Sequence, residues 1–198
     1  MRIIRTSLAL ALMLACSSTW AEWKLIPDKS QLSFVSTKKE HVAESHTFKT
    51  IQGSVDDAGN GKFVVDLASV DTKVAIRDER MREFLFQTNV YPTAVFTVGL
   101  GATKVDLISS WEPGEQETMV LDGELNLHGT KHRVNADVIV TKAGVNRVLV
   151  TSARPVIIRA EDFDLVQGIN KLAKLVNLTS ISHAVPVTFV LAFDVITP

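Results

Sequence analysis

The sequence has almost no cysteine: the only one among its 198 residues is Cys16. Because Cys16 lies in a leader that we expect to be removed, the remaining chain has no disulfide, no thiolate nucleophile and no cysteine metal ligand. The sequence also lacks a large excess of either charge, with a formal net charge of −1. Nucleic-acid-binding proteins usually carry a basic face, so we expect no nucleic acid as partner.

The first residues contain no apolar run long enough to span a membrane. The run that ends at Cys16 has about half of the roughly 18 residues that a spanning helix needs. It follows a basic start and leads to small residues at Thr19 and Ala21, a pattern that predicts a secretory signal peptide over residues 1–21, cleaved after Ala21. Lipidation of Cys16 is the alternative, although Leu14 is bulky for that motif.

Alternation of apolar and polar residues dominates residues 22–198, which we expect to form one domain. This period of two predicts strands with one buried face. The runs lie at residues 32–36, 48–55, 63–67, 94–99, 121–127, 134–141, 148–158 and 187–195. About eight such strands can bury their apolar faces either in a sandwich or in a closed barrel, and a barrel of eight has room for side chains or for one small ligand.

Two segments have helical rather than strand spacing. Apolar residues recur every three or four positions in Ile76–Phe86 and in Leu165–Val176, and Asp164 is the expected N-cap of the second segment. The charged stretch 71–81 allows two interpretations. It is either an exposed helix with weak internal ion pairs or a rim element that frames the entrance of a barrel.

Motifs for catalysis or metal binding are scarce. No serine lies in a Gly-x-Ser-x-Gly turn, and Gly99-x-Gly101 lacks the third glycine of a nucleotide loop, so we expect a turn there that leads into no helix. His41 and His46 lie with two glutamates in a segment with zinc-binding residue types, but their spacing fits no closed site. A solvated loop is the simpler interpretation of this segment.

The other histidines give no stronger indication. His128 and His132 flank a predicted turn, where we expect both side chains at the surface. We therefore predict no catalytic residue, no metal site and no cofactor.

Several blocks, in a fixed order, resemble the YceI-like family. They are Trp23–Phe34, Leu67–Thr72, Ile76–Met81, Tyr91–Phe96 and Leu121–Thr130. The resemblance implies an antiparallel lipocalin-like β-barrel of about eight strands with two short helices, located in the periplasm. It also implies an apolar lumen that holds a long isoprenoid or a similar amphiphile, without catalysis. The segment 36–39 departs from the family pattern, so the family's ligand contacts are not transferred to this chain.

The leading hypothesis is therefore a module that binds an amphiphilic lipid, such as a polyprenyl or quinone species, with a homodimer as a possible assembly. Burial of apolar surface contributes about 25 cal/mol per Å², so a lipid tail needs no ion pair to bind. We predict a lining of apolar residues from strands and helix stripes: Phe34, Phe48, Phe84, Phe96, Leu125, Phe163 and Leu172.

Two alternatives stay open. One is a hydrolase or metal-binding protein that uses His41 and His46, and the other is a stress-related structural protein whose barrel is packed solid. The interior distinguishes them, because an apolar tunnel favours lipid binding, a polar cleft with converging histidines favours chemistry, and a filled lumen favours a structural role.

Overall fold

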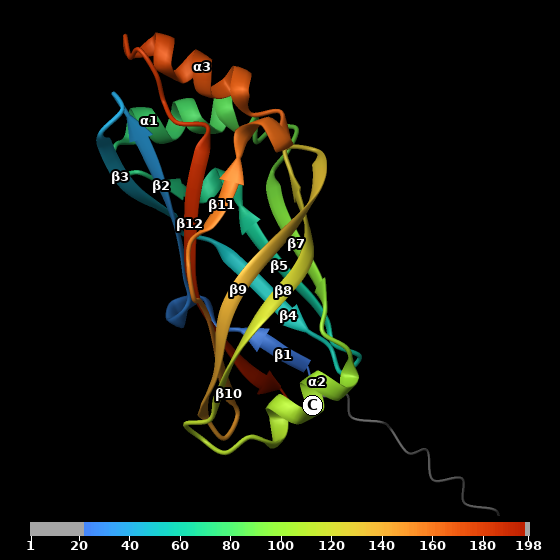
Figure 1. Ribbon diagram of the computed structural model, residues 1–198. Helices are drawn as coiled ribbons and strands as arrows, with labels where there is room; N and C mark the ends of the chain where they lie inside the picture. The colour runs from blue at the N-terminus through green and yellow to red at the C-terminus, as the bar shows by residue number, and fades with distance from the viewer. Residues whose placement is uncertain (1–21, 197–198) are drawn as a thin grey trace, which may run out of the picture.

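The computed structural model describes residues 22–196 (Figure 1), so the predicted signal peptide and its cleavage site lie outside the described residues. The strands are β1 (Glu22–Leu25), β2 (Gln31–Lys38), β3 (Val42–Phe48), β4 (Ile51–Val55), β5 (Asn60–Asp66), β6 (Val70–Asp71), β7 (Thr93–Gly99), β8 (Gln116–Leu127), β9 (Thr130–Gly144), β10 (Arg147–Ser152), β11 (Val156–Arg159) and β12 (Ala184–Ile196).

These strands form a closed antiparallel barrel of eight long strands. Four of the long strands consist of two shorter ones. Both β1 and β2 pair with β12, as do β10 and β11 on its other side. Next to β1/β2, strand β4 pairs with β1 and β3 pairs with β2, and β5 and β6 then pair with β4 and β3. Each long strand pairs with the next one in the chain, and β12 closes the ring by pairing with β1 and β2. The barrel prediction is confirmed, and closure excludes the sandwich.

Short interruptions divide the long strands. Between β1 and β2, the 3-10 turn Pro27–Lys29 (η1) displaces the chain from β12. The Ser30 hydroxyl replaces the missing ladder bonds, since it donates to the Ile26 carbonyl (2.8 Å) and accepts from the Ala192 N–H (2.9 Å). The strand predicted at 148–158 is also divided, into β10 and β11, by a short irregular segment that contains Pro155.

Both predicted helices are present. The first begins as α1 (Ala75–Arg80) and continues as one π-helical turn, η3 (Met81–Leu85), and the second is α3 (Val166–Leu175). The N-cap prediction was wrong, because Leu165 occupies that position. Asp164 instead ends the 3-10 turn Ala160–Phe163 (η4) in the left-handed conformation, with φ of 53°.

One helix was missed. The chain leaves β7 through Gly101, whose φ of 78° favours glycine, and enters α2 (Ala102–Ser110). The expectation that Gly99-x-Gly101 leads into no helix was therefore wrong. The amphipathic signal of α2 is weak because exposed and buried apolar residues, such as Leu107 and Ile108, follow one another directly. A further 3-10 turn, Leu67–Ser69 (η2), joins β5 to β6.

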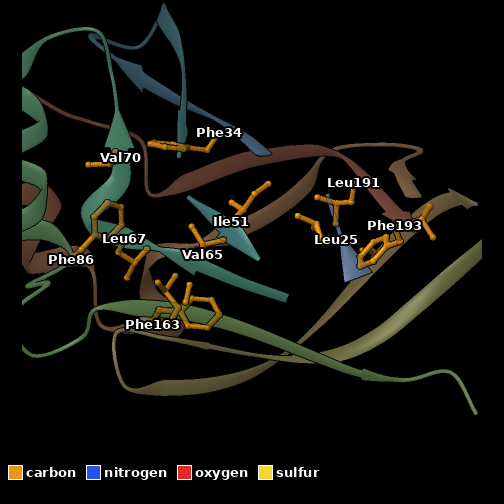
Figure 2. Packing of buried hydrophobic residues seen from close by; sticks show 14 of the residues in the cluster. Leu25, Phe34, Ile51, Val65, Leu67, Val70, Phe86, Phe163, Leu191 and Phe193 are labelled. Atoms are coloured by element: carbon orange, nitrogen blue, oxygen red, sulfur yellow. The ribbon is translucent and has the colours of Figure 1, made fainter. Parts of the chain in front are cut away.

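The helices occupy the two ends of the barrel. In Figure 1, α1 and α3 lie together at one end and α2 lies at the other. The core follows the barrel interior, where Leu25, Ile51 and Leu191 project inward from three different strands (Figure 2). Within residues 22–196, no helix has the length and apolarity needed to cross a membrane.

Candidate binding cavity

The barrel interior is hollow. Inward-facing side chains line a cavity of about 610 Å³, within the usual range for sites that hold small molecules. Phe96 and Leu125, which are partners in the β7–β8 register, both line the cavity and are only half-buried. Their remaining exposed surface faces this space. The cavity therefore offers apolar surface that an apolar guest would cover.

A glycine makes room for one of the aromatic rings. A Cβ at Gly123 would lie 2.3 Å from Cζ of Phe96, a distance that no carbon pair tolerates. The absence of a side chain at Gly123 thus lets the Phe96 ring lie flat across β8 instead of projecting further into the lumen.

One end of the cavity is closed by α2. Ile108 of α2 and Trp23 of β1 both line the cavity, and they are only 1% and 3% exposed. Val105, one turn earlier on α2, is also buried. This end is therefore a plug of tightly packed apolar side chains.

At the other end, η3 and α3 cover part of the opening. Met81 and Leu85 of η3 and Ile169 of α3 are buried and face the cavity. The two helices approach closely at Gly168, where a Cβ would lie 2.6 Å from the Phe84 carbonyl oxygen. Glycine at this position allows α3 to pack directly on the backbone of η3.

The cavity opens beside this helix pair. Val74, Ile76 and Val176 line the cavity and are nevertheless 44%, 52% and 49% exposed. We call the three segments around this opening the mouth rim: residues 38–44, 73–80 and 171–182. A backbone bond from the Lys39 N–H to the Ser180 carbonyl joins the first and third segments, and the Ser182 N–H donates to the carbonyl of Thr37, directly before the first segment.

A charged cluster fixes α1 to the mouth. Glu44 on β3 accepts from Lys38 (2.6 Å) and from Arg77 of α1 (2.9 Å), while Arg77 also donates to the Thr72 carbonyl (2.7 Å). The bond from Lys38 and the charge of Arg77 hold the pKa of Glu44 below its usual range. Of the two interpretations of residues 71–81, the contacts support the rim element.

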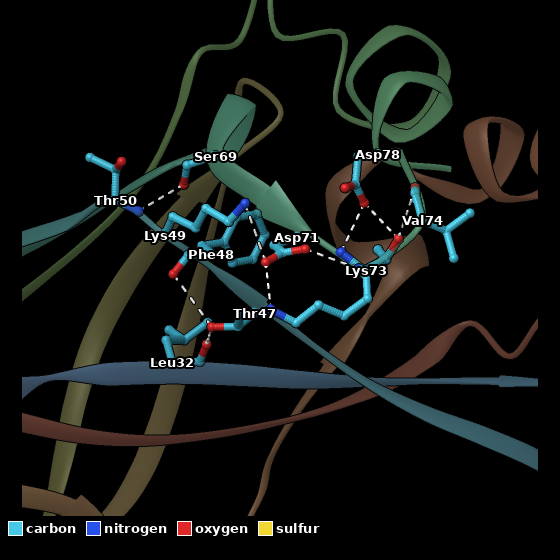
Figure 3. Close-up of polar contacts among 11 residues, drawn as sticks. Leu32, Thr47, Phe48, Lys49, Thr50, Ser69, Asp71, Lys73, Val74 and Asp78 are labelled. Carbon is cyan, nitrogen blue, oxygen red and sulfur yellow. Dashed lines mark hydrogen bonds and ion pairs between the residues drawn. The ribbon is translucent and has the colours of Figure 1, made fainter. Parts of the chain in front are cut away.

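A second set of bonds holds the start of this segment (Figure 3). Asp71 on β6 pairs with Lys49 (3.3 Å) and Lys73 (2.8 Å), and Asp78 accepts from the Thr72 backbone (2.8 Å). The hydrogen bond from Lys73 holds the pKa of Asp71 far below its usual range. These contacts fix the path of the chain from β6 into α1.

His46 of β3 is a buried polar residue of the cavity lining. It is 4% exposed, and its Nε2 shares a hydrogen bond of 2.8 Å with the Ser36 hydroxyl. Burial, with a smaller contribution from the Arg77 charge, lowers the pKa of His46. Its Nδ1 and the Nε of Arg77 are buried and have no partner among the described residues. Both nitrogens are covered by neighbouring atoms, so a guest could bond to them only after the surrounding side chains move.

The structure brings five of the predicted lining residues to the cavity and leaves two outside. Phe34, Phe48, Phe96, Leu125 and Leu172 line it. Phe163 is instead 1% exposed in the core, with its ring 6.0 Å from that of His132. Phe84 lies under Lys171, whose Nζ is 5.4 Å from the ring centroid.

Sequence reasoning missed much of the lining on the last strand. The alternate residues of β12 from Val185 to Phe193 all face the cavity. The alternation that predicted this strand also marked its buried face, so this face was available in the sequence. The polar groups of His46 and Arg77 carried no comparable signal, because they meet only when α1 folds onto β3.

The histidines do not converge. His41 has an 88% exposed side chain at the end of the β2–β3 hairpin, whereas His46 points inward from β3, so the expected solvated loop is in fact largely a strand. The surface expectation was also wrong for His128, which is buried with its ring 4.4 Å from that of Tyr91. Within residues 22–196, no group of three or more His, Cys, Asp or Glu side chains is placed to hold a metal ion.

A closed, hollow barrel of eight antiparallel strands with an apolar lumen defines a lipocalin-like protein. The family model of the YceI-like domain matches residues 23–193, and the chain belongs to the YceI-like family. This confirms the resemblance that the sequence blocks indicated.

Several solved structures are similar to this chain, including the following two. A polyisoprenoid binding domain from Saccharophagus degradans, implicated in plant cell wall breakdown, is 35% identical, with 89% of this chain and 98% of that chain covered and a TM-score of 0.84. BcnA from Burkholderia cenocepacia is 20% identical, with 85% and 98% covered and a TM-score of 0.63, which shows a shared fold. Among curated proteins, no match to the chain is found.

Proposed function

We propose that this chain is a periplasmic protein that binds a long-chain isoprenoid, or a similar amphiphilic lipid, in its barrel lumen and does not catalyse a reaction. The observation that carries the proposal is the apolar cavity of about 610 Å³, closed by α2 and open at the mouth rim. The similar domain from Saccharophagus degradans, which binds polyisoprenoid, supports the ligand class. The predicted signal peptide supports export.

The arrangement of polar groups supports an orientation for the lipid. Apolar side chains line most of the lumen, whereas the charged side chains of Lys38, Glu44 and Arg77 line the cavity near the mouth. A tail in the lumen gains from burial of apolar surface, and a polar head near the mouth contacts these charged side chains. Both polyprenyl and quinone species have a tail and an oxygen-bearing head, so both remain candidates.

The two alternatives are less well supported. A structural barrel would be packed solid, whereas this lumen holds an open volume. A hydrolase or metal protein built on His41 and His46 would bring the two side chains together, but one lies in solvent and the other inside the barrel.

Filling the lumen tests the proposal. Ala136 of β9 lines the cavity and is 5% exposed, so Ala136→Phe would place a ring where the lipid tail lies. We expect this variant to lose uptake of a fluorescent polyprenyl analogue, and the smaller Ala136→Leu to lose part of it. Asn135→Phe adds the same ring on the exposed face of the same strand and is the control.

Thermal unfolding followed by circular dichroism establishes that each variant is folded. Equal uptake by folded Ala136→Phe and by Asn135→Phe would contradict binding in the lumen. If Ala136→Phe does not fold, Ala136→Leu gives the same comparison with a smaller side chain.

A further inference from the structure

The mouth rim concentrates exposed apolar side chains. Five of them lie there, with exposed fractions from 39% to 52%: Val42, Val74, Ile76, Leu175 and Val176. Three of these also line the cavity, so the apolar surface of the lumen continues without a break onto the outside of the molecule. Contiguous apolar surface on a protein exterior marks a contact site for a protein or a membrane.

Cationic side chains surround this surface. The mouth rim contains seven lysines and arginines and four carboxylates. Glu44 is paired with Lys38 and Arg77, Asp78 accepts from Thr72, and Lys73 is paired with Asp71 beside the rim. The rim cations without such an ion pair among the described residues are Lys39, Arg80, Lys171 and Lys174. Helix α3 itself carries Lys171 and Lys174, both exposed, and no acidic residue.

The opposite end carries an excess of carboxylates, and its cations include the buried Lys142, whose Nζ donates to the Ser109 carbonyl of α2. Residues 101–117, which include α2, contain one lysine and four carboxylates, and the lysine, Lys104, is paired with Glu117 at 3.2 Å. Asp56 and Asp57 lie in the β4–β5 turn, near α2 because Leu100 donates to the carbonyl of Gly59. A negative surface would therefore attract the molecule mouth first.

We propose that the mouth rim docks on the surface of an anionic lipid bilayer. Exposed valines, leucine and isoleucine enter the headgroup layer, and the lysines contact lipid phosphates, as in other proteins that lie on a membrane without crossing it. Docking places the cavity opening against the bilayer, so that a lipid passes between the two without its tail crossing water. The inference deepens the proposed lipid binding by naming the surface from which the lumen is loaded.

Vesicle flotation of the mature chain tests the docking. We expect the protein to float with vesicles of phosphatidylglycerol and phosphatidylethanolamine, more weakly with pure phosphatidylcholine, and less as salt is raised. The double variant Lys171→Gln/Lys174→Gln should weaken binding roughly fivefold for each lysine, the equivalent of about 1 kcal/mol per charge.

A matched pair of leucines distinguishes binding through the rim from non-specific adsorption through any exposed apolar side chain. Leu175 on α3 and Leu107 on α2 are 39% and 46% exposed, and neither lines the cavity. We expect Leu175→Ser to reduce flotation severalfold and Leu107→Ser to leave it unchanged. Equal effects of the two substitutions, or no binding of the unmodified chain to anionic vesicles, would overturn the proposal.

Two further readouts assign other outcomes. Uptake of a fluorescent polyprenyl analogue without vesicles reports on the lumen alone. If Leu175→Ser loses flotation but keeps uptake, the result supports docking through the rim. If the unmodified chain floats with vesicles but takes up no analogue, lumen binding is refuted while docking is not. Light scattering reports on self-association. The unmodified chain could form a dimer that Leu175→Ser dissociates and fail to bind vesicles. That result would assign the rim to a contact with a second copy of the chain and would refute membrane docking.

Discussion

At the scale of the residue, His46 combines burial with an unpartnered ring nitrogen beside a cavity. Its pKa is lowered in the folded chain. The unfolded chain therefore binds a proton first as the pH falls, and the free energy of unfolding decreases below about pH 6.5. Above that pH the neutral ring is present in both states and the contribution is constant.

We expect His46→Gln to flatten this part of the pH dependence, measured by urea unfolding between about pH 5 and 7. His41→Gln is the control, because that side chain is 88% exposed. If His46→Gln keeps the full slope while His41→Gln removes it, the assignment to His46 is wrong.

A second residue-scale prediction concerns Gly123. Alanine at this position brings a methyl group to 2.3 Å from Cζ of Phe96 and 2.5 Å from the Thr97 carbonyl oxygen, so the ring has to rotate and the backbone of β7 or β8 has to shift. We expect Gly123→Ala to lower the free energy of unfolding by about 1–3 kcal/mol, as overpacking usually does. Adding Phe96→Leu removes the ring edge and should recover part of the loss. A double variant as unstable as the sum of the two single variants would contradict this contact.

At the scale of the element, the pair η3 and α3 closes part of the mouth and depends on the close approach at Gly168. Alanine is favoured over glycine in a helix by about 1 kcal/mol, so Gly168→Ala would stabilise an isolated α3. In the folded chain the added Cβ would lie 2.6 Å from the Phe84 carbonyl oxygen and 2.9 Å from Cα of Leu85.

We therefore expect Gly168→Ala to separate α3 from η3. Hydrogen exchange followed by mass spectrometry should show faster exchange in both helices, with β8 and β9 unchanged. Gly99→Ala is the control, since a Cβ at Gly99 would meet no atom within 4 Å. Unchanged hydrogen exchange in η3 and α3 would contradict this prediction, because it would show that the two helices accommodate the added methyl group without separating.

Most, but not all, of the strands and helices could be predicted from the sequence. Period-two alternation predicted most of the long strands, because one face of each is buried in the barrel. It missed β3, where charged residues and two histidines obscure the pattern: Glu44 and His46 face the lumen side and bond to Lys38, Arg77 and Ser36. The sequence pattern did not predict helix α2, because the position of this helix depends on Gly101 and on the barrel end that it closes.

At the scale of the whole molecule, the sequence resemblance implied the barrel, and closure of β12 on β1 and β2 completes it. The lining was harder to predict. Phe84 and Phe163 belong to apolar helical and turn segments like the true lining, and only the packing of η3 and η4 turns them away from the cavity. Which side of a short element faces the lumen depends on contacts between distant parts of the chain, which local pattern does not record.

The central claim is that the lumen holds a long-chain isoprenoid or a similar amphiphile. Native mass spectrometry of the chain, purified without detergent from the cells that produce it, tests it most directly. We expect one lipid of polyprenyl or quinone type per chain, lost in Ala136→Phe and kept in Asn135→Phe. A protein that carries no lipid, and that takes up none when a polyprenyl species is offered, would contradict the account.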